Sequence, residues 1–314
     1  MQRKKLNNFL ETIFVDSPLV CVDVGAAGGP KEPWGNSSFI KWVGVEPQEG
    51  DTPLVLGAAE GRSSLYVTHN PDSSSLLEPN ESFLSQLGVS DRYKVKEKLS
   101  VNVLPLDVWI KNINIPLVDF LKIDTQGTEL PVLLGAQESL KNVLGVDVEV
   151  NFSERYKGQS YFSDVDVFLR EKGFILFDLQ RRYFKRNSGL FLGLPKGQLT
   201  HGTALYLRSV ESFYSTISSI KDKKVQSFAV LRFASVALIY GYVDYARYIE
   251  IFFKELLTTE HASQLSELLE SFKRGPQISF RGRYRLYSLF KKCSLLLKPV
   301  GSKGNTGDEE LGNF

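Results

Sequence analysis

Acidic side chains and glycines follow several short apolar runs of this 314-residue sequence, an arrangement that suits a polar ligand. The first motif is Val-Asp-Val-Gly-Ala-Ala-Gly-Gly-Pro at residues 22–30, in which Asp23 precedes Gly25 by two positions. Glycine lets a backbone approach a ligand closely because it has no Cβ, and Pro30 suits the first turn of a helix. We therefore expect a strand, a ligand-binding turn and a helix here. A tight turn without a ligand is the alternative.

A dinucleotide-binding loop is the main competing interpretation of this motif. Such a loop needs Gly-x-Gly-x-x-Gly, so that a helix N-terminus can bind a pyrophosphate. Counted from Gly25, Ala27 and Pro30 occupy the second and third glycine positions. An acid two residues before the first glycine fits a ligand with a cationic amino acid end better, and we favour that ligand.

A second acid, Glu46, ends the Val-Gly-Val-Glu-Pro segment that follows the next apolar run. An acid about 20 residues after the glycine turn can accept hydrogen bonds from both ribose hydroxyls of an adenosine. Both classes of nucleotide cofactor use such an acid, so Glu46 does not distinguish them. A solvated surface glutamate is the alternative.

A third motif, Leu-Lys-Ile-Asp-Thr-Gln-Gly-Thr-Glu, occupies residues 121–129. Asp124 ends an apolar run, and Glu129 begins a segment with helical spacing, so we expect both acids at one edge of the sheet. For Glu129 a local role is nearly as good an explanation: Thr125 or Thr128 would cap the helix, with Glu129 in its first turn.

Short apolar runs between turn residues predict the buried strands that must position these acids. We expect strands at residues 20–24, 42–45, 53–56, 64–68, 101–106, 118–123, 143–150, 174–179 and 203–207, and helices at 129–140 and 165–171. The alternation predicts an α/β fold with a doubly wound sheet. After residue 209 only helical segments follow, at 223–257 and 261–274. We expect a main domain at 1–210, a helical extension at 211–300 and a disordered tail at 301–314.

The segment at residues 120–136, Phe-Leu-Lys-Ile-Asp-Thr-Gln-Gly-Thr-Glu-Leu-Pro-Val-Leu-Leu-Gly-Ala, resembles the signature of FkbM-family methyltransferases. The resemblance covers about residues 18–208 and departs from the family at Ala27, where asparagine is usual. Further matching segments are Asp-Val-Gly-Ala at 23–26, Val-Glu-Pro at 45–47, Gly57 to Gly61 with Leu-Tyr-Val at 65–67, Ser-Ser-Ser-Leu-Leu at 73–77, Leu-Asp at 106–107 and Val-Glu-Val at 148–150.

This resemblance implies an S-adenosylmethionine-dependent methyltransferase with a Rossmann-like, seven-stranded sheet, its last strand antiparallel and helices on both faces. It also implies O-methylation of a sugar or specialised metabolite, and we expect a small-molecule or glycan substrate in cell-surface polysaccharide biosynthesis. The implied cofactor residues are Asp23, Gly25, Ala26 and Gly29 for the methionine moiety, Glu46 with the adjoining Pro47 for the ribose, and Ala58 and Ala59 for the adenine.

Methylation of a sugar hydroxyl gains from a general base within hydrogen-bond reach. The candidates are Asp124 first, Glu149 second and His69 third, although an exposed loop histidine explains His69 equally well. We expect His201 to be structural. No His/Cys cluster indicates zinc, and we assign no metal. A hard divalent ion shared by Asp124 and Glu149 remains an open alternative.

Composition excludes some classes of partner and compartment. The net charge of +2 gives no sign of a nucleic-acid partner. Two cysteines far apart in sequence predict no disulfide framework and favour a reducing cytoplasm. The basic N-terminal residues lead into no long apolar segment, so we expect no signal peptide, and no apolar stretch is long enough for a transmembrane helix.

The segment at residues 281–298 is strongly basic, with Leu286, Leu289, Phe290 and Leu295 at near-helical spacing. It could lie on the inner face of an anionic membrane as an amphipathic helix. We favour the alternative, a helix packed on the catalytic domain or on a second subunit.

Two other functions remain open at this stage. One is a nicotinamide-dependent oxidoreductase or sugar epimerase, and the other is a non-catalytic scaffold with a methyltransferase-like fold.

Overall fold

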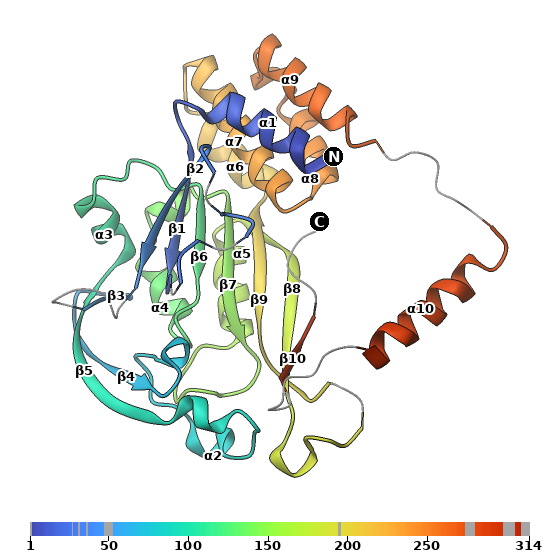
Figure 1. The fold of residues 1–314 in the computed structure, drawn as a ribbon. Coiled ribbons are helices and arrows are strands. Elements are labelled where there is room, and N and C mark those ends of the chain that lie inside the picture. The colour runs from blue at the N-terminus through green and yellow to red at the C-terminus, as the bar shows by residue number, and fades with distance from the viewer. Residues whose placement is uncertain are drawn as a thin grey trace.

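The computed structural model describes residues 2–26, 28–30, 32–35, 37–46, 53–193, 196–273, 280–297 and 305–308. A seven-stranded mixed sheet runs through the centre of the molecule, with helices packed against both faces (Figure 1). The prediction of a mixed α/β protein is confirmed.

The central sheet has the strand order β10-β8-β9-β7-β6-β1-β2. Strands β2, β1, β6 and β7 are parallel, whereas β9 is antiparallel to both of its neighbours, β7 and β8. The strands are β1 (Leu19–Val24), β2 (Ile40–Val45), β6 (Phe120–Ile123), β7 (Gly145–Asn151), β8 (Phe174–Phe184), β9 (Gln198–Arg208) and β10 (Asn305–Gly307).

A second, three-stranded sheet has the order β3-β5-β4. Its strands are β3 (Leu54–Leu56), β4 (Gly61–Thr68) and β5 (Val95–Leu104). The central sheet therefore has the predicted number of seven strands, but some of the runs expected in it belong to the second sheet. The run at 53–56 pairs with β5 in the second sheet instead. Part of the tail predicted to be disordered forms β10, which pairs with the edge of β8. An edge strand offers backbone hydrogen-bond partners to another segment, and an apolar pattern in the sequence does not reveal such pairing.

Alternate residues of the central strands face two separate cores. On β1, Val20, Val22 and Val24 pack with the helices α3 and α4, whereas Leu19 and Cys21 face the opposite side. The helices of the first core are α3 (Leu106–Asn112), α4 (Glu129–Leu134) and α5 (Phe162–Glu171). Helix α4 ends at Leu134, before the predicted residue 140, and a short 3₁₀ turn follows at Ser139–Lys141.

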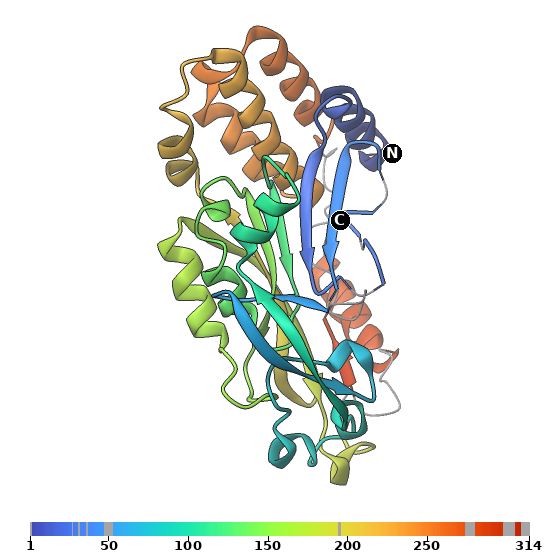
Figure 2. The same ribbon diagram turned by 90° about the vertical axis from the view of Figure 1, so that its left-hand side faces the viewer.

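The second core joins the start of the sheet to a group of helices. It contains Leu19 of β1, Phe120 of β6 and Leu207 of β9, together with residues of five helices. These are α1 (Gln2–Phe14), α6 (Val210–Ile217), α7 (Lys223–Ile239), α8 (Val243–Phe252) and α9 (Thr259–Glu270). Figure 2 shows this group at the end of the molecule away from β4 and β5. The helices after residue 210 thus share a core with the sheet, and the predicted domain division stays a prediction.

Two local predictions are wrong. The described residues between β1 and β2 form turns and bends, so no helix follows Pro30 among residues 28–30, 32–35 and 37–39. The predicted helix at 223–257 is divided into α7 and α8, because the chain turns at Gly241, whose φ is +78°. Helix α1 was not predicted.

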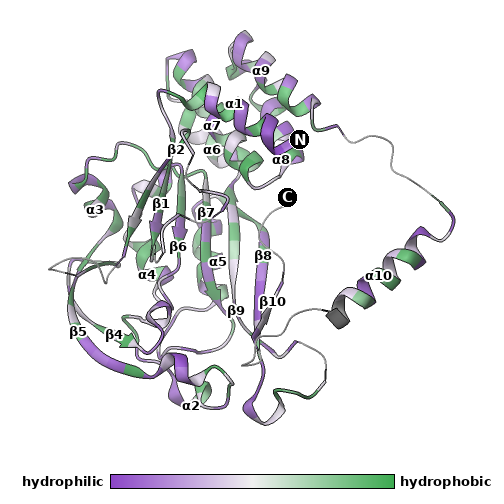
Figure 3. Ribbon diagram, in the orientation of Figure 1, coloured by the Kyte–Doolittle hydropathy of each residue, from purple (hydrophilic) through white to green (hydrophobic). Residues whose placement is uncertain are grey.

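Two further helices lie outside these layers. Helix α2 (Glu81–Leu84) precedes the short segment that leads to β5. Helix α10 (Arg283–Leu297) stands away from the body of the protein in Figure 1, and Figure 3 shows hydrophobic and hydrophilic residues interleaved along it. Within the described ranges, none of the helices combines the length and the apolar character needed to cross a membrane.

Candidate functional site

The parallel strands end at a cavity of about 310 Å³. In open α/β sheets, ligands bind beyond the carboxyl ends of the strands, and sites for small molecules occupy roughly 300–1,000 Å³. Residues from the ends of four strands line the cavity, namely Gly25 after β1, Glu46 after β2, Asp124 after β6 and Glu149 on β7. The fold thus brings the predicted acids Glu46, Asp124 and Glu149 to one cavity.

The turn after β1 is fixed by backbone contacts. Gly25 and Ala26 both donate their N–H groups to the carbonyl oxygen of Val45, at 3.0 and 3.2 Å. Gly25 has a φ of +82°, and a Cβ there would collide with the carbonyl oxygen of Asp124. Only glycine therefore fits at this position, as the sequence pattern indicated.

Asp23 does not line the cavity. Its carboxylate is buried in the sheet, where Oδ1 lies 2.7 Å from Nζ of Lys122 and Oδ2 accepts a hydrogen bond from Nε1 of Trp42. The alternation of β1 turns Asp23 to the face of the sheet that carries Lys122. A direct contact of Asp23 with a methionine moiety stays a prediction.

The remaining predicted cofactor residues divide into three groups. Glu46 lines the cavity and is half-buried. Ala26 and Gly29 lie in the turn but are not among the lining residues, and Pro47 lies outside the described residues, as does Ala27. Ala58 and Ala59 are exposed and do not line the cavity. The apolar wall comes instead from Val55 and Leu56 on β3 and from Leu65 on β4.

Three carboxylates, those of Asp124, Glu129 and Glu149, have oxygen atoms within 4.8 Å of one another. Glu129 is buried, and its Oε1 accepts hydrogen bonds from the N–H groups of Thr125 at 3.1 Å and Gly127 at 2.9 Å. Burial raises the pKa of Glu129 to about 7. Its position supports the local interpretation, since the carboxylate holds the loop that places Asp124 rather than facing the cavity.

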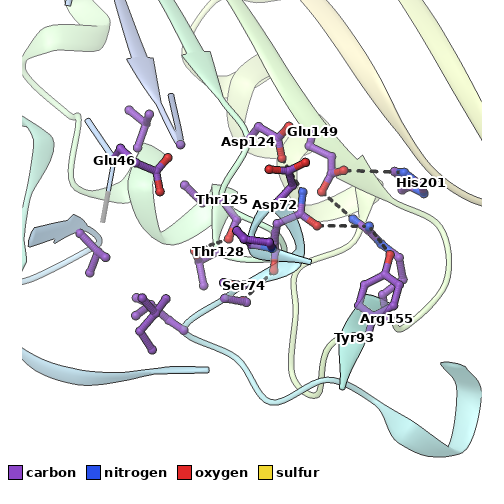
Figure 4. Close-up of a pocket in the computed structure, with 18 of the residues that line it drawn as sticks. Glu46, Asp72, Ser74, Tyr93, Asp124, Thr125, Thr128, Glu149, Arg155 and His201 are labelled. Atoms are coloured by element: carbon purple, nitrogen blue, oxygen red, sulfur yellow. Dashed lines mark hydrogen bonds and ion pairs between the residues drawn. The ribbon is translucent and has the colours of Figure 1, made fainter. Parts of the chain in front are cut away.

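Glu149 forms a buried ion pair that the sequence did not predict. Its Oε2 lies 2.5 Å from Nη2 of Arg155, which also donates from Nε to Oδ1 of Asn151 and from Nη1 to the hydroxyl of Tyr93. Burial raises the pKa of Glu149 to about 8, although the guanidinium of Arg155 opposes this shift. Figure 4 shows Arg155 and Tyr93 on one side of Glu149 and Glu46 on the other.

The structure separates the two histidines considered from the sequence, His69 and His201. His201, expected to be structural, lines the cavity; Nε2 lies 3.8 Å from Oε1 of Glu149, and Nδ1 lies 3.0 Å from Oγ1 of Thr200. Burial and neighbouring guanidinium groups hold the pKa of His201 well below its usual range, so the ring is neutral at neutral pH. His69 is exposed and does not line the cavity, which agrees with the exposed-loop alternative.

Sequence reasoning missed several cavity residues. Arg155, Tyr93, Gln126, Arg92 and Arg182 all line it. For Arg155 the sequence offered a weak signal. It follows the polar end of β7 by four residues, and a side chain at that spacing can reach back to the strand. For Arg92 and Arg182 the sequence offered no signal, because only the folding of distant segments brings them to the cavity.

Most oxygen atoms of the carboxylate cluster already have a partner among the described residues. Glu129 is occupied by backbone N–H groups, Glu149 by Arg155, and Oδ1 of Asp124 by Nε2 of Gln126 at 2.6 Å. A divalent ion bound by these residues would compete with a buried guanidinium for Glu149. The residues do not fit a shared metal, and we derive no chemistry from one.

Comparison with known proteins gives one match. Residues 36–176 match the family model described as the methyltransferase FkbM domain, which confirms the predicted resemblance over that range. The matched range holds Glu46, Asp124, Glu149 and Arg155, whereas Gly25 and His201 lie outside it. No curated protein and no solved structure matches the chain.

Proposed function

We propose, from the premise that the chain contains a methyltransferase FkbM domain, that the protein is an S-adenosylmethionine-dependent O-methyltransferase. Its acceptor in this proposal is a sugar hydroxyl of a cell-surface glycan or a related metabolite. The observation that carries the proposal is the cavity that Glu46 and Asp124 both line, at the carboxyl ends of the parallel strands β2 and β6 on either side of β1.

The lining of the cavity fits the cofactor group by group. The carboxylate of Glu46 offers two acceptor oxygens for a pair of vicinal ribose hydroxyls. The apolar side chains of Val55, Leu56 and Leu65 offer a surface for a planar base. Bound there, S-adenosylmethionine supplies a methyl group already activated by a positively charged sulfur, so the protein mainly has to align the acceptor and accept its proton.

Asp124 is the residue best placed to accept that proton. Glu129 faces the loop, and Glu149 is held by Arg155, whereas Asp124 uses only Oδ1, for Gln126, among the described residues. Its other oxygen is therefore open to an acceptor hydroxyl in the cavity. This arrangement makes Asp124 the general base, with Glu149 and Arg155 shaping the neighbouring wall.

A dinucleotide fits less well. Its pyrophosphate is usually bound at a helix N-terminus directly after the first strand. The described residues between β1 and β2 form no helix. This observation weakens the oxidoreductase and epimerase interpretation, in agreement with the missing glycines of the loop.

Calorimetry on the full chain tests the cofactor directly. S-adenosylhomocysteine should bind with a micromolar or lower dissociation constant, and NAD should not. Replacing Glu46→Gln should weaken binding by roughly 10- to 100-fold, because a hydrogen bond to a charged group contributes about 1.5–3 kcal/mol. Glu97→Gln, which alters an exposed glutamate on β5, is the matched control. Tighter binding of NAD would overturn the proposal.

Mass spectrometry of surface glycans tests the acceptor. A strain that lacks the protein should lose one methyl group from one sugar, and a plasmid carrying Asp124→Asn should not restore it. Unchanged glycans would contradict the glycan acceptor. Full restoration by a variant that no longer binds S-adenosylhomocysteine would favour a scaffold.

A further inference from the structure

The charged residues of the cavity are divided between its two ends. Glu46 lies at one end, and Arg155, Tyr93 and His201 lie at the other (Figure 4). Two more arginines belong to this second end. Arg92 directly precedes Tyr93, and Arg182 of β8 is paired in register with His201 of β9.

Most of the charge at the second end is already balanced. The guanidinium of Arg155 already has a buried partner, because its Nη2 lies 2.5 Å from Oε2 of Glu149. His201 is kept neutral by burial and by the three neighbouring arginines, which lower its pKa. Glu46, Asp72 and Asp124 are further acids of the cavity, and Arg92, which is half-buried, and Arg182, which is exposed, are its remaining bases.

Neither of these arginines has a carboxylate partner. Within the described part of the chain, no ion pair involves Arg92 or Arg182. Arg182 donates from Nη2 to the amide oxygen of Gln180 at 3.0 Å. Nη2 of Arg92 lies 2.9 Å from the side-chain amide of Asn70, which accepts in its favoured orientation. Both contacts are with neutral side chains.

We propose that the methyl acceptor carries a negatively charged group, a carboxylate or a phosphate, and that Arg92 and Arg182 bind this group at the end of the cavity away from Glu46. A guanidinium presents paired N–H donors that match the oxygens of both anions. Two guanidinium groups without a carboxylate partner among the described residues lie at this cavity, and such groups favour an anionic ligand close to them. The inference rests on the proposed function, since it names the substrate class of the same site.

The acceptor's charge also explains how the site separates its two ligands. The cofactor carries a positive sulfur and a cationic amino group, which suit the carboxylates of Glu46 and Asp124. An anionic acceptor is drawn to the opposite end, and its neutral hydroxyl then lies between the arginines and the Asp124 carboxylate. Each ligand is disfavoured at the other's end by like charge.

Calorimetry with defined probes tests this inference on the full chain saturated with S-adenosylhomocysteine. The probes are inorganic phosphate, methyl glucuronide, glucose 1-phosphate and the uncharged methyl glucoside. At least one charged sugar should bind at least tenfold more tightly than methyl glucoside. Stronger binding of methyl glucuronide identifies a carboxylate, and stronger binding of glucose 1-phosphate identifies a phosphate.

Variants then locate the anion. The double variant Arg92→Gln/Arg182→Gln should lose both the preference for charged sugars and the binding of phosphate. The control Arg62→Gln/Arg170→Gln removes the same net charge from exposed positions that do not line the cavity, and it should keep both. Equal loss in the two double variants would overturn the inference, as would a wild-type protein that binds neither phosphate nor any charged sugar better than methyl glucoside.

Failure of the cofactor assignment would give a different result. Binding of S-adenosylhomocysteine is measured first on each protein, and its absence in the wild type would contradict the proposed function alone. The charged and uncharged probes are then compared without it, and a preference that depends on Arg92 and Arg182 would still support the anion subsite.

Discussion

The backbone of Gly25 lies against the carbonyl oxygen of Asp124, so closely that no side chain fits between them. This contact joins the turn after β1 to the loop after β6. The two segments are about a hundred residues apart in sequence, and each contributes to the same cavity wall. The position of the Asp124 carboxylate therefore depends on the absence of a side chain at residue 25.

Replacing Gly25→Ala should destabilise the protein more than a positive φ alone explains. Gly28 is the matched control, because it has the same φ of +82° but no atom within 4 Å of an added Cβ. Gly28→Ala should cost roughly 1–3 kcal/mol from backbone strain, and Gly25→Ala should cost clearly more. Urea unfolding of the two variants without ligand measures the difference. Equal losses would show that the contact with Asp124 is not tight.

Replacing Asp124→Asn should slow methyl transfer by about 10²- to 10⁴-fold, the usual contribution of a general base. Asparagine can still accept from Gln126, so binding of S-adenosylhomocysteine should be unchanged. Single-turnover rates with the acceptor and calorimetry with the product separate the two effects. Asp244→Asn, at an exposed position of α8, is the control. A rate close to that of the wild type would mean that another residue is the general base.

Replacing Arg232→Met should destabilise the protein by about 3–5 kcal/mol, because it leaves the buried carboxylate of Asp119 without its cation. Arg232 joins α7 to the sheet, since it also donates to the carbonyl oxygens of Ser17 and Pro18. Arg247→Met removes a partly exposed ion pair with Glu250 and should cost about 1 kcal/mol or less. Chemical unfolding compares the two variants. A small loss in Arg232→Met would mean that Asp119 finds another partner.

Replacing Asp147→Asn should flatten the dependence of stability on pH. Burial raises the pKa of Asp147 from 3.8 to about 7, with Asp124 and Asp23 adding to the shift and Lys122 opposing it. Between about pH 4 and pH 7 the folded protein keeps a proton that the unfolded chain has lost. The free energy of unfolding therefore falls as the pH rises through this window.

Urea unfolding at pH 4.5 and pH 8 measures this fall in both proteins. Glu129 and Glu149 contribute a change of the same sign to each, so the difference between the two proteins isolates Asp147. The wild type should lose more stability than Asp147→Asn on going to pH 8. Identical losses would show that Asp147 is ionised in the folded protein across the whole range.

The sequence favoured packing of helix α10 on the catalytic domain or on a second subunit, but nearly all side chains at 283–294 are exposed, so we now predict that the helix binds an anionic membrane surface. The helix contains no acidic residue, and its Leu286, Leu289 and Phe290 side chains are exposed. Sedimentation of the full chain with phosphatidylserine vesicles should show salt-dependent binding. Arg285→Gln/Lys292→Gln should weaken it by about 2 kcal/mol, at roughly 1 kcal/mol per basic residue, and Arg62→Gln/Arg170→Gln should not. No sedimentation at low salt would favour packing on the body or on a second copy.

Local pattern was sufficient for the parallel strands and for the residues at their ends. The runs that became β1, β2, β6 and β7 are apolar and end in polar residues, because a buried strand must leave the core where the ligand site begins. Asp124 and Glu149 follow from that rule, whereas Gly25 follows from the glycine turn and Glu46 also from its spacing to Gly25.

Only the tertiary structure decided which of these side chains face the cavity and what surrounds them. Strand alternation and pairing turn Asp23 towards Lys122, and the loop after β7 folds Arg155 back on Glu149. Arg92, Arg182 and His201 come from three separate segments, and β10 forms only because β8 has a free edge. Such contacts join residues far apart in sequence, and their free energy depends on burial and charge in the folded chain, which local spacing does not encode.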